Sequence, residues 1–329
     1  MATTARCCLR HVETVWSQRT LGTAHPRLLR SDDVAGKNLG RDTATASCSI
    51  IIPFRDAEQT LEQAVRAVAD QVAGRPVEII LVDNGSSDGS RARALALGAE
   101  YDTIRLVDAS HVTGPAATRN VGAEQASSSI LAFTDADDVV LPGWVDALLN
   151  LRGAPDLFAS GPVLRFENGQ VPGPESQPGR RAQMWHMRYR PYADGSNLVV
   201  AREVFVKAAG FDTGLQTGED VDLSWRLQRD GIVLHFVPEL RVAARWRDTT
   251  CATLRQYYRY GRGDVLLFKR HRVDGAQRDP LITLARAYAG VLLRLPLLGI
   301  KATRRRWAHQ AGRRVGRLMG SLRNRVFYP

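Results

Sequence analysis

Three aspartates follow an apolar run near the middle of the chain. Asp135, Asp137 and Asp138 end the segment that begins with the apolar residues 130–134, and Pro142 lies four residues beyond the last aspartate. A short apolar run predicts a buried strand, so the carboxylates are expected at one edge of a sheet. Crowded carboxylates repel one another, and a divalent cation such as Mg²⁺ or Mn²⁺ relieves that repulsion. The pattern therefore predicts a metal site suited to phosphate chemistry; the alternative is a solvated turn in which an aspartate caps the next helix.

A second acidic pair, Glu219 and Asp220, opens a predicted helix. Residues 218–227 place Asp222 and Arg226 four positions apart, which brings their side chains together on a helix. Acids in a first turn also complement the positive end of the helix dipole, so a structural role is the alternative to a chemical one.

Alternating strand and helix patterns must position these acids. The apolar runs are short and rich in β-branched residues, which is typical of strands buried in a parallel sheet. Right-handed crossovers are expected to join such strands. The expected strands are residues 48–54, 77–82, 103–107, 130–134 and 196–201, the expected helices are residues 61–72, 114–125 and 145–151, and residues 161–179 are expected to form loop and short antiparallel strands.

Ligands of such sheets bind beyond the carboxyl ends of the strands. Pro53, Asp83 and Asp135 all fall at such ends, which predicts one binding edge. For Asp83, which begins a turn containing Asn-Gly and Asp-Gly, capping of that turn is the alternative.

Composition bounds the class of protein. A chain of 329 residues with 44% hydrophobic residues suffices for one large α/β domain with appendages. The net charge of +11 comes from one end, because residues 281–329 contain eleven Lys or Arg and no Asp or Glu. This concentration predicts an acidic partner, either an anionic membrane surface or nucleic acid. Four cysteines without metal-ligand spacing or a disulfide framework indicate a reducing cytoplasm.

The two ends of the chain differ from its middle. Residues 1–47 lack apolar periodicity and predict a poorly ordered leader, or a stretch upstream of the true start. Residues 281–300 are apolar but are interrupted by Arg286, Arg294 and Pro296, so they make a poor membrane span. With the basic residues that follow, they predict helices lying on an anionic bilayer at the cytoplasmic face of the cell membrane, in preference to nucleic acid. A soluble helical role, a partner protein and a transmembrane segment are the alternatives.

Four blocks of this sequence follow one another in a characteristic order and spacing. They are residues 49–57, residues 81–90, residues 134–138 with Pro142 and Trp144, and residues 218–223 with Arg226. Together they resemble the family 2 inverting glycosyltransferases of the GT-A fold, and the resemblance runs over residues 48–270. It implies an α/β fold with a Rossmann-like, mostly parallel central sheet and flanking helices. We expect the leader 1–47 before this domain and a basic helical extension, residues 271–329, after it.

The resemblance also implies how the nucleotide is bound. Pro53 and Phe54 would line the base, and Asp83 would accept a hydrogen bond from the base or the ribose. Arg119 would approach the nucleotide end of the site; an exposed helical arginine is the alternative.

The family's Asp-x-Asp signature matches Asp135 and Asp137. Asp137 would bind the Mg²⁺ or Mn²⁺, Asp135 would lie near the ribose and share the metal site, and Asp138 would support them. Residues 244–247 stand roughly where many relatives carry a histidine that helps to hold the metal, so ligands beyond Asp137 stay open.

The catalytic step is implied in the same way. In the family pattern the second acid of the pair is the general base, so Asp220 would deprotonate the acceptor hydroxyl, with Glu219 as runner-up. A divalent cation would neutralise the departing diphosphate. Aromatic residues between the two acidic blocks would contact the acceptor or pack in the core, and two arginines further on would lie near the diphosphate or in solvent. These residues are Trp185, His186, Tyr189 and Tyr192, and Arg259 and Arg262.

The expected function is therefore a metal-dependent inverting glycosyltransferase. It would move a sugar from a nucleotide-diphosphate sugar to a glycan or lipid-linked acceptor in the synthesis of the cell envelope. One alternative, a sugar nucleotidyltransferase, would need a glycine-rich phosphate loop after the first strand, and residues 53–57 lack it. The other is a non-catalytic membrane or nucleic-acid binding module with a degenerate donor site, against which the intact Asp137 and Asp220 argue.

Overall fold

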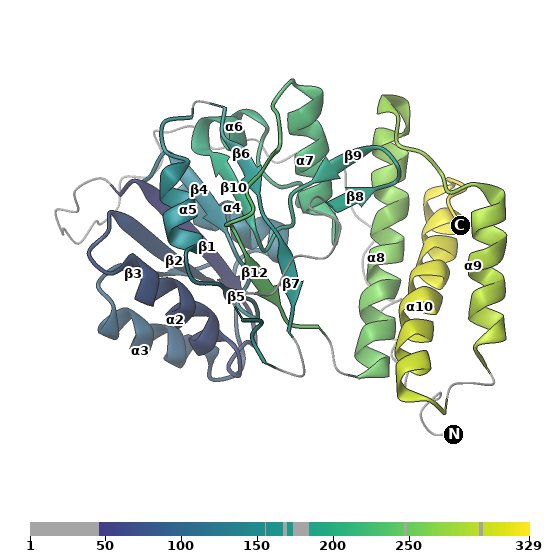
Figure 1. The fold of residues 1–329 in the computed structure, drawn as a ribbon, viewed down its shortest axis with the longest axis horizontal. Helices are drawn as coiled ribbons and strands as arrows, with labels where there is room; N and C mark the ends of the chain where they lie inside the picture. The colour runs from purple at the N-terminus through teal and green to yellow at the C-terminus, as the bar shows by residue number, and fades with distance from the viewer. Residues whose placement is uncertain (1–45, 155, 167–169, 174–183, 247–248, 296–298) are drawn as a thin grey trace. The chain divides into compact units, whose positions relative to one another are not determined.

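A seven-stranded, mostly parallel sheet lies at the centre of the described chain (Figure 1). Its strands are β1 (Cys48–Phe54), β2 (Val77–Asp83), β3 (Ile104–Asp108), β4 (Ile130–Phe133), β6 (Phe158–Ser160), β10 (Leu198–Ala201) and β11 (His235–Phe236). Their order is β11-β6-β10-β4-β1-β2-β3. Pairing is parallel from β3 through β4, whereas β10 runs antiparallel to both its neighbours. The expected class, α/β with a mostly parallel central sheet, is confirmed.

The computed structural model describes residues 46–329, except 155, 167–169, 174–183, 247–248 and 296–298. Almost all of the expected leader, residues 1–47, therefore lies outside the described residues. Residues Ala44–Pro329 form one compact unit. The helices associated with the sheet are α2 (Leu61–Val72), α3 (Ser90–Glu100), α4 (Pro115–Gln125), α5 (Trp144–Asn150), α6 (Arg202–Lys207) and α7 (Glu219–Arg229).

The order of the strands decides which helix covers which face of the sheet. From β1 the chain moves outward to β2 and β3, and then returns past β1 to β4. Right-handed crossovers therefore put α2 and α3 on one face and α4 on the other. Gly122 lets α4 lie close to the sheet, because a Cβ there would come within 2.5 Å of the Ile51 side chain and 2.9 Å of the Val82 side chain.

Two local predictions differ from the structure. Helix α3 was not expected, because its buried residues Ser90, Ala94 and Leu97 are few and mark no broad apolar stripe. Loop and short antiparallel strands were expected in residues 161–179, of which residues 167–169 and 174–179 lie outside the described residues. The strand that the structure describes there, β7 (Val163–Arg165), pairs in parallel with β12 (Val242–Ala244). A partner so far along the chain leaves no local pattern. The remaining strands are β5 (Val139–Val140), antiparallel to β12, and the hairpin of β8 (Met184–His186) and β9 (Arg190–Tyr192).

Glycines bring two C-terminal helices into backbone contact. The helices of this layer are α8 (Thr250–His271), α9 (Leu281–Leu293) and α10 (Lys301–Asn324). A Cβ at Gly261 of α8 would lie 2.1 Å from the carbonyl oxygen of Arg313, and one at Gly316 of α10 would lie 2.2 Å from that of Tyr258. Only residues without a side chain permit this approach, so α10 packs tightly along α8.

Buried ion pairs reinforce this packing. Asp264 of α8 accepts hydrogen bonds from Arg313 Nε at 2.7 Å and from Arg317 Nε at 2.7 Å. Burial raises the pKa of Asp264, but Arg313, His186 and Arg317 outweigh this and keep it well below its usual range. Arg314 and Arg317 also pair with Asp279, at 3.6 and 3.0 Å. Three arginines of the basic extension are thus engaged inside the molecule.

Membrane crossing was one of the alternatives for this layer. Over the described stretches of the chain, no helix combines the length and the apolar character that a membrane crossing requires.

Candidate active site

Arg119 of α4 connects the two acidic blocks. Its Nη2 donates to Asp135 Oδ1 at 2.6 Å and its Nη1 donates to Glu219 Oε1 at 2.9 Å. The Arg119 side chain is only 6% exposed, so it is not the solvent-exposed helical arginine that the sequence allowed. Asp135 comes from the end of β4 and Glu219 from the first turn of α7, which places the strand-end acids and the helix-start acids around one guanidinium.

The acids beyond β4 repel one another. Asp138 is buried, whereas Asp135 and Asp137 are half-buried. Burial, followed by the charges of Asp135, Asp137 and Asp194, raises the pKa of Asp138 well above its usual value. Asp138 Oδ1 accepts a hydrogen bond from the backbone N–H of Arg245 at 3.2 Å. Residues 244–247, where many relatives would carry a histidine, thus contact Asp138 through a backbone N–H group.

Asp194 is an acid of this site that the sequence did not single out. Its carboxylate accepts bonds from the backbone N–H and the hydroxyl of Ser196, at 3.0 and 2.8 Å. Because β10 is antiparallel to β4, Leu198 pairs with Phe133, and the start of β10 meets the end of β4. The turn-forming sequence Asp-Gly-Ser before an apolar strand was the available signal, but only the strand pairing brings Asp194 to the site.

Asp220 is held beside Asp194. Its Oδ2 accepts a bond from the backbone N–H of Gly195 at 3.0 Å, and its Oδ1 accepts one from Val221 N–H at 2.8 Å. Burial, with the charges of Glu219 and Asp194, raises the pKa of Asp220 to about 8. A carboxyl group with a pKa near neutrality has the property required of a general base.

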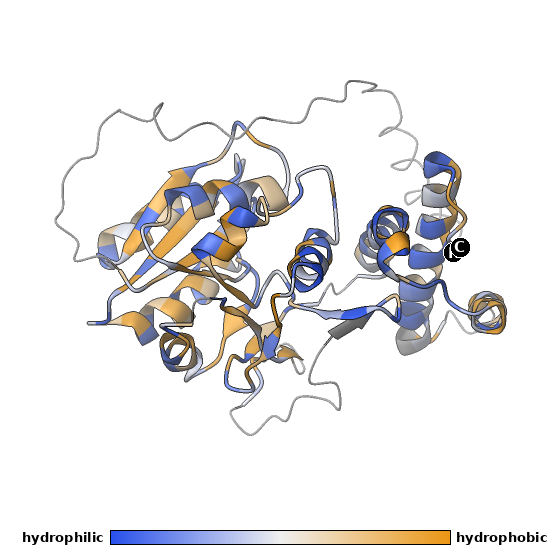
Figure 2. Cartoon of the chain, turned by 90° about the horizontal axis from the view of Figure 1, so that it is seen from above, coloured by the Kyte–Doolittle hydropathy of each residue, from blue (hydrophilic) through white to orange (hydrophobic). Residues whose placement is uncertain are grey.

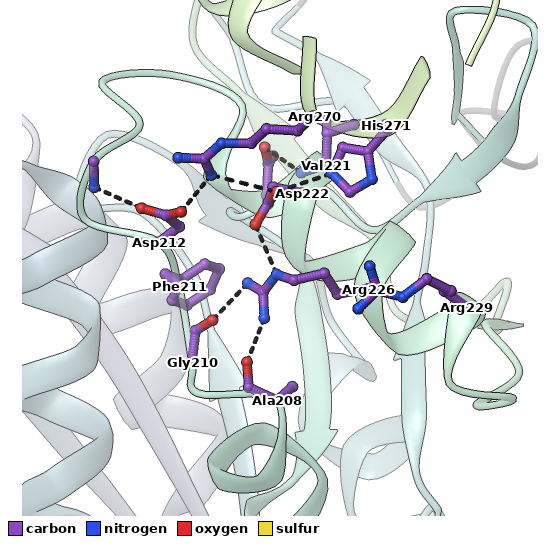
Figure 3. Close-up of polar contacts among 12 residues, drawn as sticks. Ala208, Gly210, Phe211, Asp212, Val221, Asp222, Arg226, Arg229, Arg270 and His271 are labelled. Carbon is purple, nitrogen blue, oxygen red and sulfur yellow. Dashed lines mark hydrogen bonds and ion pairs between the residues drawn. The ribbon is translucent and has the colours of Figure 1, made fainter. Parts of the chain in front are cut away.

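An ion-pair network fixes the helix that carries these acids (Figure 3). Asp222 accepts from Arg226 Nε at 2.8 Å, as the four-residue spacing predicts, and it contacts His271 Nε2 at 2.9 Å. Arg226 donates onward to the carbonyl oxygens of Ala208 and Gly210. Although burial raises the pKa of Asp222, its bonds to His271 and Arg226 keep it below its ordinary value. The network anchors α7 to α8 and to the loop after α6.

The residues expected at the nucleotide base lie at the carboxyl ends of β1 and β2. Phe54 is 3% exposed and belongs to the main hydrophobic core, whereas Pro53 is half-buried. Asp83 Oδ1 accepts from the backbone N–H and the hydroxyl of Ser86, at 2.9 and 2.8 Å, and its Oδ2 accepts from Arg91 at 3.0 Å. Asp83 therefore does cap its turn, and a role in nucleotide binding stays a prediction.

The aromatic residues expected near the acceptor surround a buried tryptophan. His186 stacks on Trp225 with ring centroids 6.2 Å apart, and Tyr189 meets Trp225 edge-on at 5.1 Å. Tyr192 lies edge-on to His186 at 6.4 Å. The side chain of Trp185 lies outside the described residues.

The two arginines expected near the diphosphate lie on α8. Arg259 is exposed. The backbone of Arg262 lies against α10, because a Cβ at Gly320 would lie 3.3 Å from the Arg262 Cα. Arg262 thus lies where α8 packs against α10, and a role of either arginine at the diphosphate stays a prediction.

The acids suit a divalent cation that arrives with a phosphate group. In the part of the chain that the structure describes, no three His, Cys, Asp or Glu side chains are placed to hold a metal by themselves. Mg²⁺ is commonly bound through only one or two carboxylates together with substrate phosphates. Burial and then the neighbouring carboxylates raise the pKa of Asp138, and a cation would relieve the repulsion among those carboxylates.

Known proteins are similar to this chain in sequence and in fold. The family model for Glycosyl transferase family 2 matches residues 49–207, and that for Glycosyl transferase family group 2 matches residues 180–309. Glycosyltransferase AglE of Haloferax volcanii is 26% identical over 230 residues, which cover 69% of this chain and 75% of AglE. The pre-mycofactocin glycosyltransferase of Mycobacterium tuberculosis is 27% identical over 232 residues, but the match covers only 48% of that protein and 68% of this chain.

A solved structure shows the same architecture. The mannosyltransferase PcManGT from Pyrobaculum calidifontis, in complex with GDP-Man and Mn²⁺, superposes with a TM-score of 0.61 at 17% identity, over 85% of this chain and 89% of that chain. At this identity the likeness concerns the fold, and it confirms the expected GT-A class. The two family matches together run from residue 49 to residue 309 and include every acid of the candidate site. The chain therefore belongs to the family 2 glycosyltransferases.

Proposed function

We propose that this glycosyltransferase moves a sugar from a nucleotide-diphosphate sugar to a hydroxyl group of a glycan or lipid-linked acceptor, with inversion and with Mg²⁺ or Mn²⁺. The observation that carries the proposal is the bridge from Arg119 to both Asp135 and Glu219. It joins the acids suited to the diphosphate and the acids suited to the acceptor at one site, as a single displacement requires.

The reaction needs a proton acceptor on the acceptor side of the sugar. The acceptor oxygen forms a bond to the anomeric carbon while the bond from that carbon to the diphosphate oxygen breaks. The hydroxyl proton passes to the Asp220 carboxylate, and the nucleoside diphosphate leaves with the bonding electron pair. Because attack and departure occur on opposite sides of one carbon, the anomeric configuration inverts.

Asp220 suits the role of base better than Glu219. The Glu219 carboxylate is committed to the buried Arg119, and its side chain is 9% exposed. Asp220 accepts hydrogen bonds from the backbone N–H groups of Gly195 and Val221, and its pKa is raised to about 8. A group that binds its proton near neutral pH both accepts the acceptor proton and releases it in each cycle.

Asp137, with Asp135, would hold the divalent cation. When bound with the donor, the cation supplies Lewis-acid neutralisation of the diphosphate oxygens, which carboxylates cannot provide. The charge-assisted hydrogen bond from Arg119 orients the Asp135 carboxylate.

We further propose that the enzyme works at the cytoplasmic face of the cell membrane, in the synthesis of envelope glycans. The support is the charge of residues 281–329, where eleven basic residues occur with no acidic one. Such a segment is attracted to anionic lipids, which would bring the enzyme to a lipid-linked acceptor.

The test combines donor binding with turnover. We expect at least one nucleoside diphosphate or nucleotide sugar to raise the Tm, and to do so more strongly with Mn²⁺ or Mg²⁺ than with EDTA. Asp220→Asn should keep that stabilisation and lose about 10²- to 10⁴-fold in turnover, measured as release of nucleoside diphosphate. Asp146→Asn, an exposed aspartate of α5, is the matched control and should keep full turnover.

Two outcomes would contradict the proposal. If no nucleotide or nucleotide sugar in the panel raises the Tm in the presence of metal, the donor site is absent. If Asp220→Asn loses donor binding together with turnover, the role of Asp220 is structural.

A further inference from the structure

Helix α9 exposes apolar side chains over most of its length. Of its 13 residues only Leu284 is buried. The exposed ones include Leu281 at 77%, Ile282 at 62%, Leu292 at 65% and Leu293 at 74%. Their spacing, i, i+1, i+11 and i+12, puts all four on one face of the helix. Apolar residues gathered on one exposed face mark a contact with something that excludes water.

The other face of α9 packs against α10. Trp307 Nε1 donates to the carbonyl oxygen of Val291 at 3.1 Å, and Arg294 Nη1 donates to Gln310 at 3.1 Å. The Arg314 guanidinium lies 5.8 Å from the centre of the Tyr288 ring. These contacts, together with the packing of α10 on α8, turn the apolar face of α9 away from the sheet. Figure 2 shows α9 as a mostly orange helix at the edge of the molecule.

The basic residues near α9 differ in their availability. Arg313, Arg314 and Arg317 of α10 are engaged by Asp264 or Asp279. By contrast, Arg286 on α9 and Arg304 and Arg306 in the first turns of α10 are exposed. A helix with apolar residues on one face and arginines beside it has the pattern of helices that lie in the headgroup region of an anionic bilayer.

Charge argues against a second copy of the chain as the occupant of this face. Two copies of the chain meeting through α9 would bring Arg286 and the first turns of both α10 helices together, which is repulsive. Residues 281–329 contain no acidic residue, so the segment has no negative charge of its own to offset this repulsion. An anionic lipid surface supplies the missing negative charge.

We propose that the exposed apolar face of α9, flanked by Arg286, Arg304 and Arg306, docks the enzyme on an anionic lipid surface. This proposal rests on the proposed membrane attachment and makes it more specific, because it assigns the lipid contact to the single helix α9. At 13 residues and about 1.5 Å per residue, α9 is shorter than the hydrocarbon core, so it lies in the plane of the interface. Helix α10 packs between α9 and α8 and so connects α9 to the rest of the chain.

Vesicle flotation tests this assignment without any use of catalysis. The full-length protein is mixed with vesicles of phosphatidylcholine containing phosphatidylglycerol, or of phosphatidylcholine alone. We expect the protein to float with the anionic vesicles, and the double variant Ile282→Glu/Leu293→Glu to lose about tenfold or more in its partition coefficient. Leu95→Glu, an equally apolar-to-acidic change at a 57% exposed position of α3, should float like the parent.

Each other outcome overturns the assignment. If the parent protein does not float with anionic vesicles, the apolar face of α9 does not bind lipid. Leu322 is a 76% exposed residue of α10. If Leu322→Glu abolishes flotation and the α9 double variant does not, the docking surface lies on α10. If lipid-free protein is a dimer by light scattering and the α9 double variant is a monomer, the face joins two copies. Circular dichroism confirms that each variant is folded, and turnover of a water-soluble acceptor reports separately on the proposed reaction.

Discussion

Replacing Arg119 by methionine tests whether one guanidinium unites the two acidic blocks. Methionine keeps much of the buried volume but removes both charge-assisted hydrogen bonds, at 2.6 Å to Asp135 and 2.9 Å to Glu219. The side chains of Arg119 and Glu219 are 6% and 9% exposed, and that of Asp135 is 32% exposed, so at least the Glu219 charge would be left buried without its partner. Breaking a buried pair from one side costs about 3–5 kcal/mol in free energy of unfolding.

Urea unfolding followed by circular dichroism measures this free energy. The control is Arg75→Met, which breaks the exposed pair of Arg75 with Asp146, where the side chains are 36% and 63% exposed. An exposed pair contributes about 0–1 kcal/mol, so the two variants should differ by several kcal/mol. Arg119→Lys should fall between them, because a single ammonium group cannot bridge two carboxylates in the way a planar guanidinium does. An Arg119→Met protein as stable as Arg75→Met would refute the reasoning.

Three further predictions concern other groups. Because the pKa of Asp220 is raised to about 8, kcat/KM should rise with pH toward a plateau above about 8, and a flat pH profile would count against Asp220 as the base. The same carboxyl group should favour folding at low pH and lose that contribution as the pH rises, so Asp220→Asn should be less active yet more stable than the parent at alkaline pH. Asp264→Asn should lower the free energy of unfolding by about 3–5 kcal/mol, because Arg313 and Arg317 lose their counter-charge, and the loss should shrink as the parent's Asp264 is itself protonated in strong acid. Gly316→Ala should cost about 1–3 kcal/mol by forcing α10 away from α8, whereas Gly299→Ala, where a Cβ meets open space, should be close to neutral in the same unfolding assay.

Much of the fold could be read from local patterns. The strands β1, β2 and β4 and the helices α2, α4 and α7 follow from apolar periodicity and from turn residues at their ends, which depend on residues close together in the chain. Helix α3 and the parallel pairing of β7 were missed, because a weak stripe and a partner nearly 80 residues away leave little local signal.

The candidate site divides in the same way. The sequence identified Asp135, Asp137, Glu219 and Asp220 as acids at element ends, since motif and position are local properties. It did not identify Asp194, whose approach to the site depends on the antiparallel pairing of β10 with β4.

By itself, the sequence determined the class of fold, the acidic blocks and the accumulation of positive charge at one end, because each is a matter of composition or short-range order. Only the tertiary structure decided how those charges are used. Arg119 donates hydrogen bonds to Asp135, 16 residues away, and to Glu219, 100 residues away. Asp264 accepts hydrogen bonds from two arginines that lie about 50 residues further along the chain. Ion pairing and helix packing act between groups that are close in space, and distance along the chain does not specify which groups those will be.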